Sequence, residues 1–273
     1  MMKQGLCFLL PGALAIGIAH AQARELRVCA DPNNLPFSNV KGQGFENKIV
    51  DLIAKDLAAK VQYTWWAQRR GFVRKTLKAE TCDLWPGIAT KDDMVATTQP
   101  YYRSTYVFVT RADRHLDIHS FDDPKLRHLK IGVEMVGYDA QNTPPAHALA
   151  RRGITKNVRG FLLFGDYRTP NPPASIVHAV ADGSIDVGLV WGPLAGYFAN
   201  KEPVALTVTP VEPAQDGTQF PMTFNISMGV RHGNGALQTE IDRELRRNKS
   251  KITAILAAYH VPTLAEIPAH PEN

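Results

Sequence analysis

The chain has 273 residues, of which 44% are hydrophobic and 21% charged, with a formal net charge of +5. This length leaves room for two compact domains, and the composition is that of a globular protein, which excludes long disordered segments. The positive charge is spread among acidic neighbours, as in Lys91-Asp92-Asp93. That distribution argues against nucleic-acid binding, but it would suit an acidic protein partner.

Residues 1–23 have the pattern of an export signal. Lys3 is their only charged residue, an apolar run extends from Leu6 to Ala19, and small-x-small cleavage patterns follow at Ala19-His20-Ala21 and Ala21-Gln22-Ala23. The run is shorter than the roughly 20 apolar residues that a membrane anchor needs. We therefore predict a cleavable signal peptide, a periplasmic mature protein and no stable membrane insertion.

The first part of the mature chain alternates strand-like and helix-like segments. In the helix that begins at Phe45, apolar residues such as Ile49 and Ile53 recur at three- and four-residue spacing. Such alternation predicts a parallel sheet with a ligand crevice at the carboxyl ends of its strands. The expected elements are strands at 25–30, 61–66 and 84–88, and helices at 45–60 and 69–79.

A strand at 101–111 and a polar crossover at 113–123 lead into a second α/β series. Its expected elements are strands at 129–133, 185–190 and 205–208, helices at 140–152 and 174–182, and a loop at 160–173. After a second crossover at 210–217, a core segment at 222–230 and a helix at 236–259 follow. We predict a first lobe at 24–111 plus 211–273 and a second lobe at 112–210, joined by two hinge crossovers.

Cleavage of the signal leaves two cysteines, Cys29 and Cys82. An even number of cysteines in an oxidising compartment favours a disulfide, and two buried free thiols are the alternative. The predicted fold places the two cysteines at neighbouring strands, which favours the bond.

The order of short motifs along the mature chain resembles that of the type 2 periplasmic binding proteins, the bilobed receptors of bacterial solute uptake. The resemblance implies an α/β fold of two lobes, each a mostly parallel sheet flanked by helices, that closes on a ligand by hinge motion. It implies a binding protein and not an enzyme. The matching motifs are Leu26-Arg27-Val28 running into Asp31 and Pro36-Phe37, Gly44-Phe45, Thr76-Leu77-Lys78-Ala79 with Cys82-Asp83, Gln99-Pro100-Tyr101-Tyr102 and Asp182-Gly183-Ser184-Ile185-Asp186-Val187-Gly188.

Three longer strings resemble the MoxJ/XoxJ-like members, which are associated with quinoprotein dehydrogenases. They are residues 29–38 (CADPNNLPFS), 68–74 (QRRGFVR) and 190–198 (VWGPLAGYF). The resemblance implies a periplasmic accessory to a pyrroloquinoline-quinone-dependent alcohol (methanol) dehydrogenase, with an ABC-transporter substrate receptor that partners a permease as the alternative. It implies no cofactor of the chain's own.

One departure from the wider family bears on the ligand. Amino-acid receptors usually carry an arginine after the third strand that grips the ligand carboxylate, whereas Met94 stands at that place in the segment 90–94. An amino-acid ligand is therefore not expected.

Side chains at the strand ends are the candidates for contact with a small ligand, because aromatic walls with a few polar groups are typical of such sites. Each candidate has a simpler alternative: Asp31 would cap a turn, and Arg69 and Arg70 would form a solvated helix start instead of an anion site. Tyr167 in the long loop is a weaker candidate. The ligand-binding candidates are Asp31, Phe37, Arg69, Arg70, Tyr101, Tyr102 and Trp191.

No motif for a catalytic nucleophile, a bound phosphate, zinc or a dinucleotide occurs in the sequence. His115 and His119 have the spacing of a metal pair on a helix, but their segment is not helix-like, so we expect no metal site. A periplasmic lyase that uses Asp31 or Glu134 as acid or base is the alternative of another class.

Overall fold

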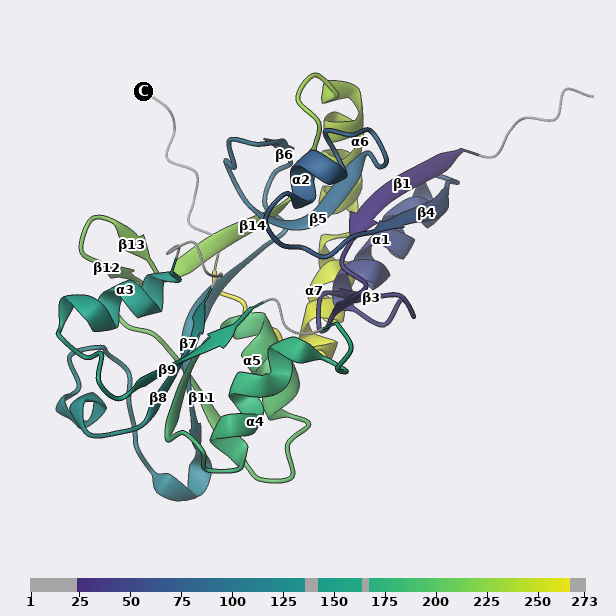
Figure 1. Ribbon diagram of the computed structural model, residues 1–273. Helices are drawn as coiled ribbons and strands as arrows, with labels where there is room; N and C mark the ends of the chain where they lie inside the picture. Colours follow the sequence, from purple (N-terminus) through teal and green to yellow (C-terminus); the bar gives the residue numbers. More distant parts are fainter. Residues whose placement is uncertain (1–23, 136–141, 164–166, 266–273) are drawn as a thin grey trace, which may run out of the picture.

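The computed structural model describes residues 24–135, 142–163 and 167–265. The predicted signal peptide lies outside these residues. The chain forms two lobes, which Figure 1 shows as an upper part that holds β1, β4 and β5 and a lower part that holds β8, β9 and β11. The predicted α/β fold of two lobes flanked by helices is confirmed, and the sheet is mixed, with antiparallel strands beside the parallel ones.

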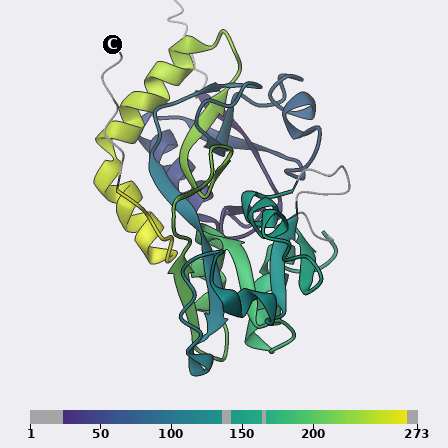
Figure 2. The same cartoon turned by 90° about the vertical axis from the view of Figure 1, so that its left-hand side faces the viewer.

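The first lobe is built on β1 (Glu25–Ala30), which pairs in parallel with β4 (Lys60–Trp65) and β5 (Leu84–Ala89). Strand β14 (Thr223–Val230) extends this sheet in the antiparallel sense and also pairs with β6 (Ala96–Thr97). Three helices share one apolar core with the sheet, namely α1 (Phe45–Asp56), α6 (Gly235–Arg247) and α7 (Lys249–Ala258). Figure 2 shows α6 and α7 following one another along one side of the molecule.

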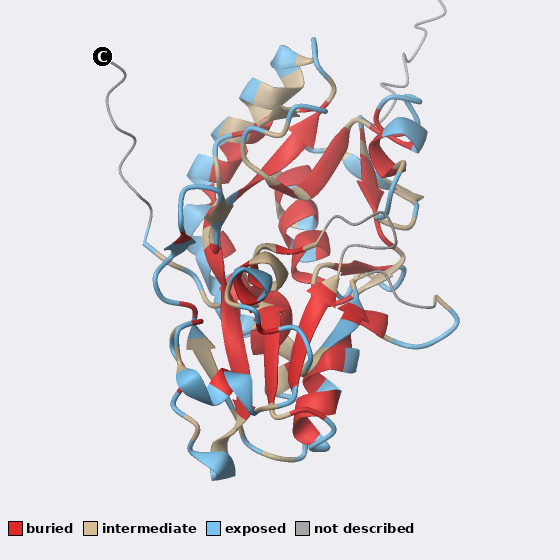
Figure 3. Cartoon of the chain, turned by 60° about the vertical axis from the view of Figure 1, so that its left-hand side comes forward, coloured by how far each residue is buried: buried red, intermediate tan, exposed pale blue. Residues whose placement is uncertain are grey.

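The second lobe is built on β10 (Val187–Trp191), which lies between β8 (Ile131–Met135) and β7 (Tyr102–Arg111). Strands β9 (Val158–Leu162) and β11 (Leu206–Pro210) complete the sheet. Helices α4 (Ser175–Ala181) and α5 (Gly192–Ala199) share one core with it, and α3 (Pro144–Arg151) belongs to another. In both lobes the strands are largely buried while the outer helix faces are exposed (Figure 3).

Strand β7 belongs to both lobes. Its first residues pair with β14, as in Thr105 opposite Thr223, whereas Tyr106 lies opposite Trp191 of β10. The chain therefore changes sheets between Thr105 and Tyr106, inside the strand. The lobe boundaries at 111 and 210 stay a prediction, and these pairings favour boundaries near 105 and 222.

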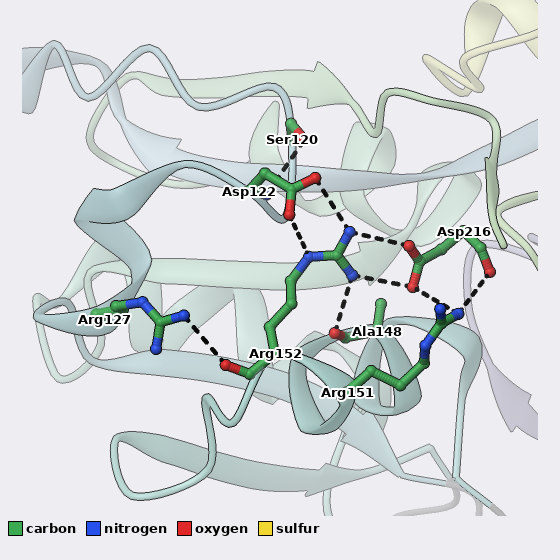
Figure 4. Close-up of polar contacts among 7 residues, drawn as sticks. All are labelled: Ser120, Asp122, Arg127, Ala148, Arg151, Arg152 and Asp216. Carbon is green, nitrogen blue, oxygen red and sulfur yellow. Dashed lines mark hydrogen bonds and ion pairs between the residues drawn. The ribbon is translucent and has the colours of Figure 1, made fainter.

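Residues 211–222, which lead back to the first lobe, are attached to the second one. They include the short strands β12 (Gln215–Asp216) and β13 (Phe220–Pro221). Arg152 binds Asp216 through Nη1 and Nη2 at 3.0 and 2.9 Å, and it binds Asp122 through Nε and Nη2 at 2.7 and 3.1 Å (Figure 4). One guanidinium thus ties β12 to the second lobe.

The predicted disulfide is confirmed. It joins Cys29 at the end of β1 to Cys82 just before β5, with 5.5 Å between the Cα atoms. Both cysteines are fully buried in an apolar cluster with Phe72, Trp85 and Ile88.

Three predicted segments differ from the structure. The basic helix at 69–79 is reduced to α2 (Phe72–Lys75), which ends at Thr76, whose hydroxyl donates to the Phe72 carbonyl at 2.6 Å. The long helix at 236–259 is two helices that meet at Asn248. The first residues of the loop predicted at 160–173 belong instead to β9. This strand lies at the edge of the sheet, and most of its residues are exposed, so its sequence lacks the apolar pattern of a buried strand.

The remaining short elements lie in connections. They are β2 (Asn33–Asn34), β3 (Ser38–Asn39) and the 3-10 turns η1 (Ala112–Arg114), η2 (Pro124–Arg127) and η3 (Pro172–Ala174). In the part of the chain that the structure covers, no helix is long and apolar enough to cross a bilayer.

Candidate ligand-binding cavity

A cavity of about 290 Å³ lies between the two lobes. Both lobes contribute to its wall, and most of the lining side chains are aromatic or aliphatic. The first lobe provides Asn34, Phe37, Glu46, Gln68, Gly87, Tyr102, Phe224 and Ile226, and the second lobe provides Tyr106, Leu163, Pro173, Trp191 and Leu194.

Three aromatic rings form one part of this wall. Tyr106 follows the point where β7 changes sheets, Trp191 ends β10, and Phe224 lies in β14. The Trp191 ring lies 5.2 Å from the Tyr106 ring and 5.8 Å from the Phe224 ring, at interplanar angles of 64° and 72°. The steep angles orient the three rings in different directions around the cavity.

Glu46 is the carboxyl group of the cavity. It stands in the first turn of α1 and is only 4% exposed. A Cβ atom on Gly87 would lie 1.9 Å from its Oε1, so Glu46 occupies the space that this glycine leaves open. Burial, together with the negative charge of nearby Asp31, raises the pKa of Glu46 to about 8.

Asp31 does not line the cavity; it organises the loops beside it. The side chain is 1% exposed, and its Oδ1 accepts the backbone N–H of Asn33 at 2.8 Å. Its Oδ2 accepts the backbone N–H of Gln68 at 2.7 Å and the hydroxyl of Tyr167. These bonds match the turn-capping alternative for Asp31, so any contribution to ligand binding would be indirect.

The two lobes also touch beside the cavity. Tyr167 of the second lobe bonds to Asp31 of the first. Asn33 Nδ2 donates to the Thr169 carbonyl at 2.9 Å, and its Oδ1 accepts the backbone N–H of Asn171 at 3.3 Å. These contacts hold the loop 167–171 against the loop that follows β1.

Glu134 supports Trp191 from behind the cavity wall. Its Oε2 accepts the Trp191 backbone N–H at 2.9 Å, and the side chain is 2% exposed. Burial raises the pKa of Glu134 to about 8. Because neither Glu134 nor Asp31 lines the cavity, the structure gives the predicted lyase carboxylates no direct access to a ligand there.

Only some of the other predicted site residues line the cavity. Phe37, Tyr102 and Trp191 line the cavity, whereas exposed Arg69 and Arg70 do not. Tyr101 packs on Tyr102 with ring centroids 5.0 Å apart and borders a second hollow of the first lobe. Contact with a ligand stays a prediction for all of them.

Sequence reasoning missed Glu46, Tyr106 and Phe224. Glu46 follows the Gly44-Phe45 motif at a helix start, where acidic residues are usually solvated. Tyr106 and Phe224 lie inside strands, where an aromatic residue is normally interpreted as part of the hydrophobic core. Only the pairing of β7 with both sheets shows that these positions face the junction of the lobes.

A metal site is not formed by the residues described: they contain no cluster of three histidine, cysteine or acidic side chains. Exposed His119 bonds instead to Asp117 of the same loop, at 2.8 Å from Nε2 to Oδ1.

Residues 26–261 match the family model of the bacterial extracellular solute-binding proteins, family 3. The chain is 37% identical to protein MoxJ of Methylorubrum extorquens over 257 residues, which cover 90% of this chain and 84% of the relative. It is 30% identical to protein MoxJ of Paracoccus denitrificans over 273 residues, which cover 93% of this chain and 95% of the relative.

Among solved structures, the periplasmic binding protein XoxJ from Methylobacterium extorquens AM1 superposes with a TM-score of 0.72 at 37% identity. The superposition covers 88% of this chain and 100% of XoxJ. This chain therefore shares both lobes with XoxJ, which is a periplasmic binding protein. With the family model matched over nearly the whole described chain, this protein belongs to the bacterial extracellular solute-binding proteins, family 3.

Proposed function

We propose that this chain is a periplasmic binding protein that holds a small molecule in the interlobe cavity and serves a quinoprotein methanol dehydrogenase system. The cavity is the observation that carries the binding part of the proposal. It is lined by side chains of both lobes, so an occupant that contacts both would stabilise the closed arrangement. Ligand pockets are commonly built in this way, from apolar walls with few polar groups.

The cavity lining does not suit an amino-acid ligand. Among the residues that the structure describes, the lining contains no lysine, arginine or histidine, whereas a ligand carboxylate needs a cationic or strong hydrogen-bond donor. An anionic group would instead face Glu46, with Asp31 close behind it. Met94, which stands where the family's arginine is expected, is 47% exposed and does not line the cavity.

The association with a dehydrogenase rests on similarity. The three strings that resemble the MoxJ/XoxJ-like members all reach the cavity: residues 29–38 supply Asn34 and Phe37, residues 68–74 supply Gln68, and residues 190–198 supply Trp191 and Leu194. Each of the three strings therefore contributes to the candidate site.

A substrate receptor for an ABC transporter is the second candidate, and the position of the cavity between the lobes favours it because uptake receptors close on their solute. The two candidates differ in the expected partner. The receptor would bind a permease, and the accessory protein would bind the dehydrogenase.

A pull-down from native periplasm tests the proposal. The mature chain is the bait, and mass spectrometry identifies co-purifying proteins and any released small molecule. Recovery of a quinoprotein dehydrogenase supports the proposal, while recovery of a metabolite without that enzyme supports the transport receptor. Turnover of a periplasmic metabolite that is lost in Glu46→Gln would overturn both in favour of a lyase.

A further inference from the structure

The interlobe cavity combines two features that neutral ligands do not require together. The first is its number of aromatic side chains: Phe37, Tyr102, Tyr106, Trp191 and Phe224 all line it. The faces of aromatic rings carry partial negative charge and attract cations within about 6 Å of the ring centroid. Tyr106, Trp191 and Phe224 pack edge to face on one another and form a continuous aromatic wall, and such walls bind alkylated ammonium groups.

The second feature is a buried acid without a counter-charge. Among the described residues, the influences on the pKa of the Glu46 carboxyl group are burial and the charge of Asp31, with no hydrogen-bond donor and no cation. The ionisable groups that act on Glu46 or are acted on by it are Asp31, Tyr63, Tyr101 and Tyr102, and all of them are acidic. Buried carboxylates are normally paired, so the missing partner is a donor or a cation.

We propose that the interlobe cavity binds a small organic cation, an alkylated ammonium group that contacts the aromatic wall and pairs with the Glu46 carboxylate. This inference rests on the proposed function only in treating the cavity as the ligand site. The cavity of about 290 Å³ accommodates a small ammonium compound. Gly87 supports the arrangement, because any larger residue there would displace the Glu46 carboxyl.

The observations favour a cation over the alternatives. An anion would meet Glu46 and the nearby Asp31, and the described residues of the lining include no basic side chain. A neutral ligand could accept a hydrogen bond from protonated Glu46, but it would gain only ordinary apolar contact from the rings. A cation gains from both features at once, since it neutralises the buried acid and contacts the ring faces.

Three compounds of nearly equal shape test the charge preference: choline, its neutral analogue 3,3-dimethylbutan-1-ol and the anion 3,3-dimethylbutanoate. The mature chain is partly unfolded, dialysed and refolded to remove any co-purified ligand, and binding is measured by titration calorimetry at pH 7. We expect choline to bind at least about tenfold more tightly than the neutral analogue, and the anion not to bind.

Two variants identify the groups responsible. Glu46→Gln keeps the shape of the side chain, and we expect it to abolish the preference for choline over the neutral analogue. Phe224→Leu keeps an apolar wall but removes one ring, and we expect choline to weaken more than the neutral analogue. Glu240→Gln, on the outer helix α6, is the matched control and leaves both affinities unchanged.

Proton release gives a readout that a merely structural role of Glu46 would not produce. A cation that pairs with Glu46 displaces its proton, so calorimetry at pH 7 in buffers of different ionisation enthalpy should report a release approaching one proton per choline. Glu46→Gln should release none.

Equal or tighter binding of 3,3-dimethylbutan-1-ol overturns the inference. So does the absence of choline binding in a correctly folded chain. Neither result decides the proposed function. The pull-down tests that function separately, because it detects the dehydrogenase and any released metabolite.

Discussion

The hydroxyl of Tyr167 donates a hydrogen bond to Oδ2 of Asp31 and so joins the second lobe to the first beside the cavity. Asp31 keeps two backbone N–H partners, from Asn33 and Gln68, when this hydroxyl is absent. The bond therefore contributes to closure of the cleft more than to the fold of either lobe.

Tyr167→Phe should open the cleft more often while changing the free energy of unfolding by only about 1 kcal/mol. Amide hydrogen exchange in the loop 167–171 should become faster, and a bound ligand should dissociate faster. Tyr197→Phe is a control, since the Tyr197 ring stacks on Tyr259 and does not line the cavity. Unchanged exchange in Tyr167→Phe would show that the contact does not hold the lobes together.

The two buried carboxyls make stability depend on pH. The pKa of Glu46 and that of Glu134 rise from near 4.5 to about 8 in the folded chain. Between these values the folded state keeps protons that the unfolded state releases, so stability is full at low pH and falls as pH rises to about 8. Urea unfolding from pH 5 to 8 should show this decline.

Glu46→Gln and Glu134→Gln should each remove part of the decline, by at most about 1.4 kcal/mol per pH unit and per carboxyl. Exposed Glu25→Gln is the control and should leave the decline unchanged. If stability depended on pH in the same way in all three variants, Glu46 and Glu134 would not have the raised pKa values that their burial produces.

The disulfide should contribute strongly to the stability of the first lobe. Cys29 and Cys82 are 53 residues apart. In a chain-entropy account, closing a loop of that length raises the free energy of the unfolded chain by about 4 kcal/mol, because it lowers that chain's entropy. A Cys29→Ala/Cys82→Ala variant should lose stability of that order in urea. Reductant should lower the melting temperature of the native chain but not that of the variant.

Arg152 should matter far more than its neighbour Arg151. Arg152→Ala removes both bonds to the buried Asp216 and should cost about 3 kcal/mol, because it leaves a buried carboxylate poorly paired. The Arg151 side chain is 51% exposed, so its ion pair with Asp216 contributes little, and Arg151→Ala should cost less than about 1 kcal/mol. Equal losses in the two variants would contradict the network in Figure 4.

The fold was predictable because its signals are local. Apolar spacing identifies α1, and short, largely apolar segments followed by turn-forming residues identify β1 and β10. The break between α6 and α7 was not predictable, because it depends on a contact between distant residues. Asn248 donates to Asp56 at 2.8 Å, across 192 positions of sequence.

The site was predictable only where strand ends mark it. Phe37, Tyr102 and Trp191 lie at strand ends or in the loops beside them, and they were found for that reason. Glu46 was missed because its burial depends on Gly87 in another strand, and a glycine gives no local sign of the side chain that will fill its space. Arg69 and Arg70 were selected because they follow a strand end and carry cationic donors, but the structure leaves both exposed and outside the described cavity lining.

The most direct test of the central claim is the mass of the protein isolated from its own periplasm, measured under native and then denaturing conditions. The account predicts an excess mass corresponding to one small molecule in the native measurement, lost on denaturation and absent in Gly87→Val, whose side chain would displace Glu46 in the cavity. A native mass equal to that of the bare chain, together with no binding of any of the three test compounds, would contradict the claim that this cavity is a ligand site.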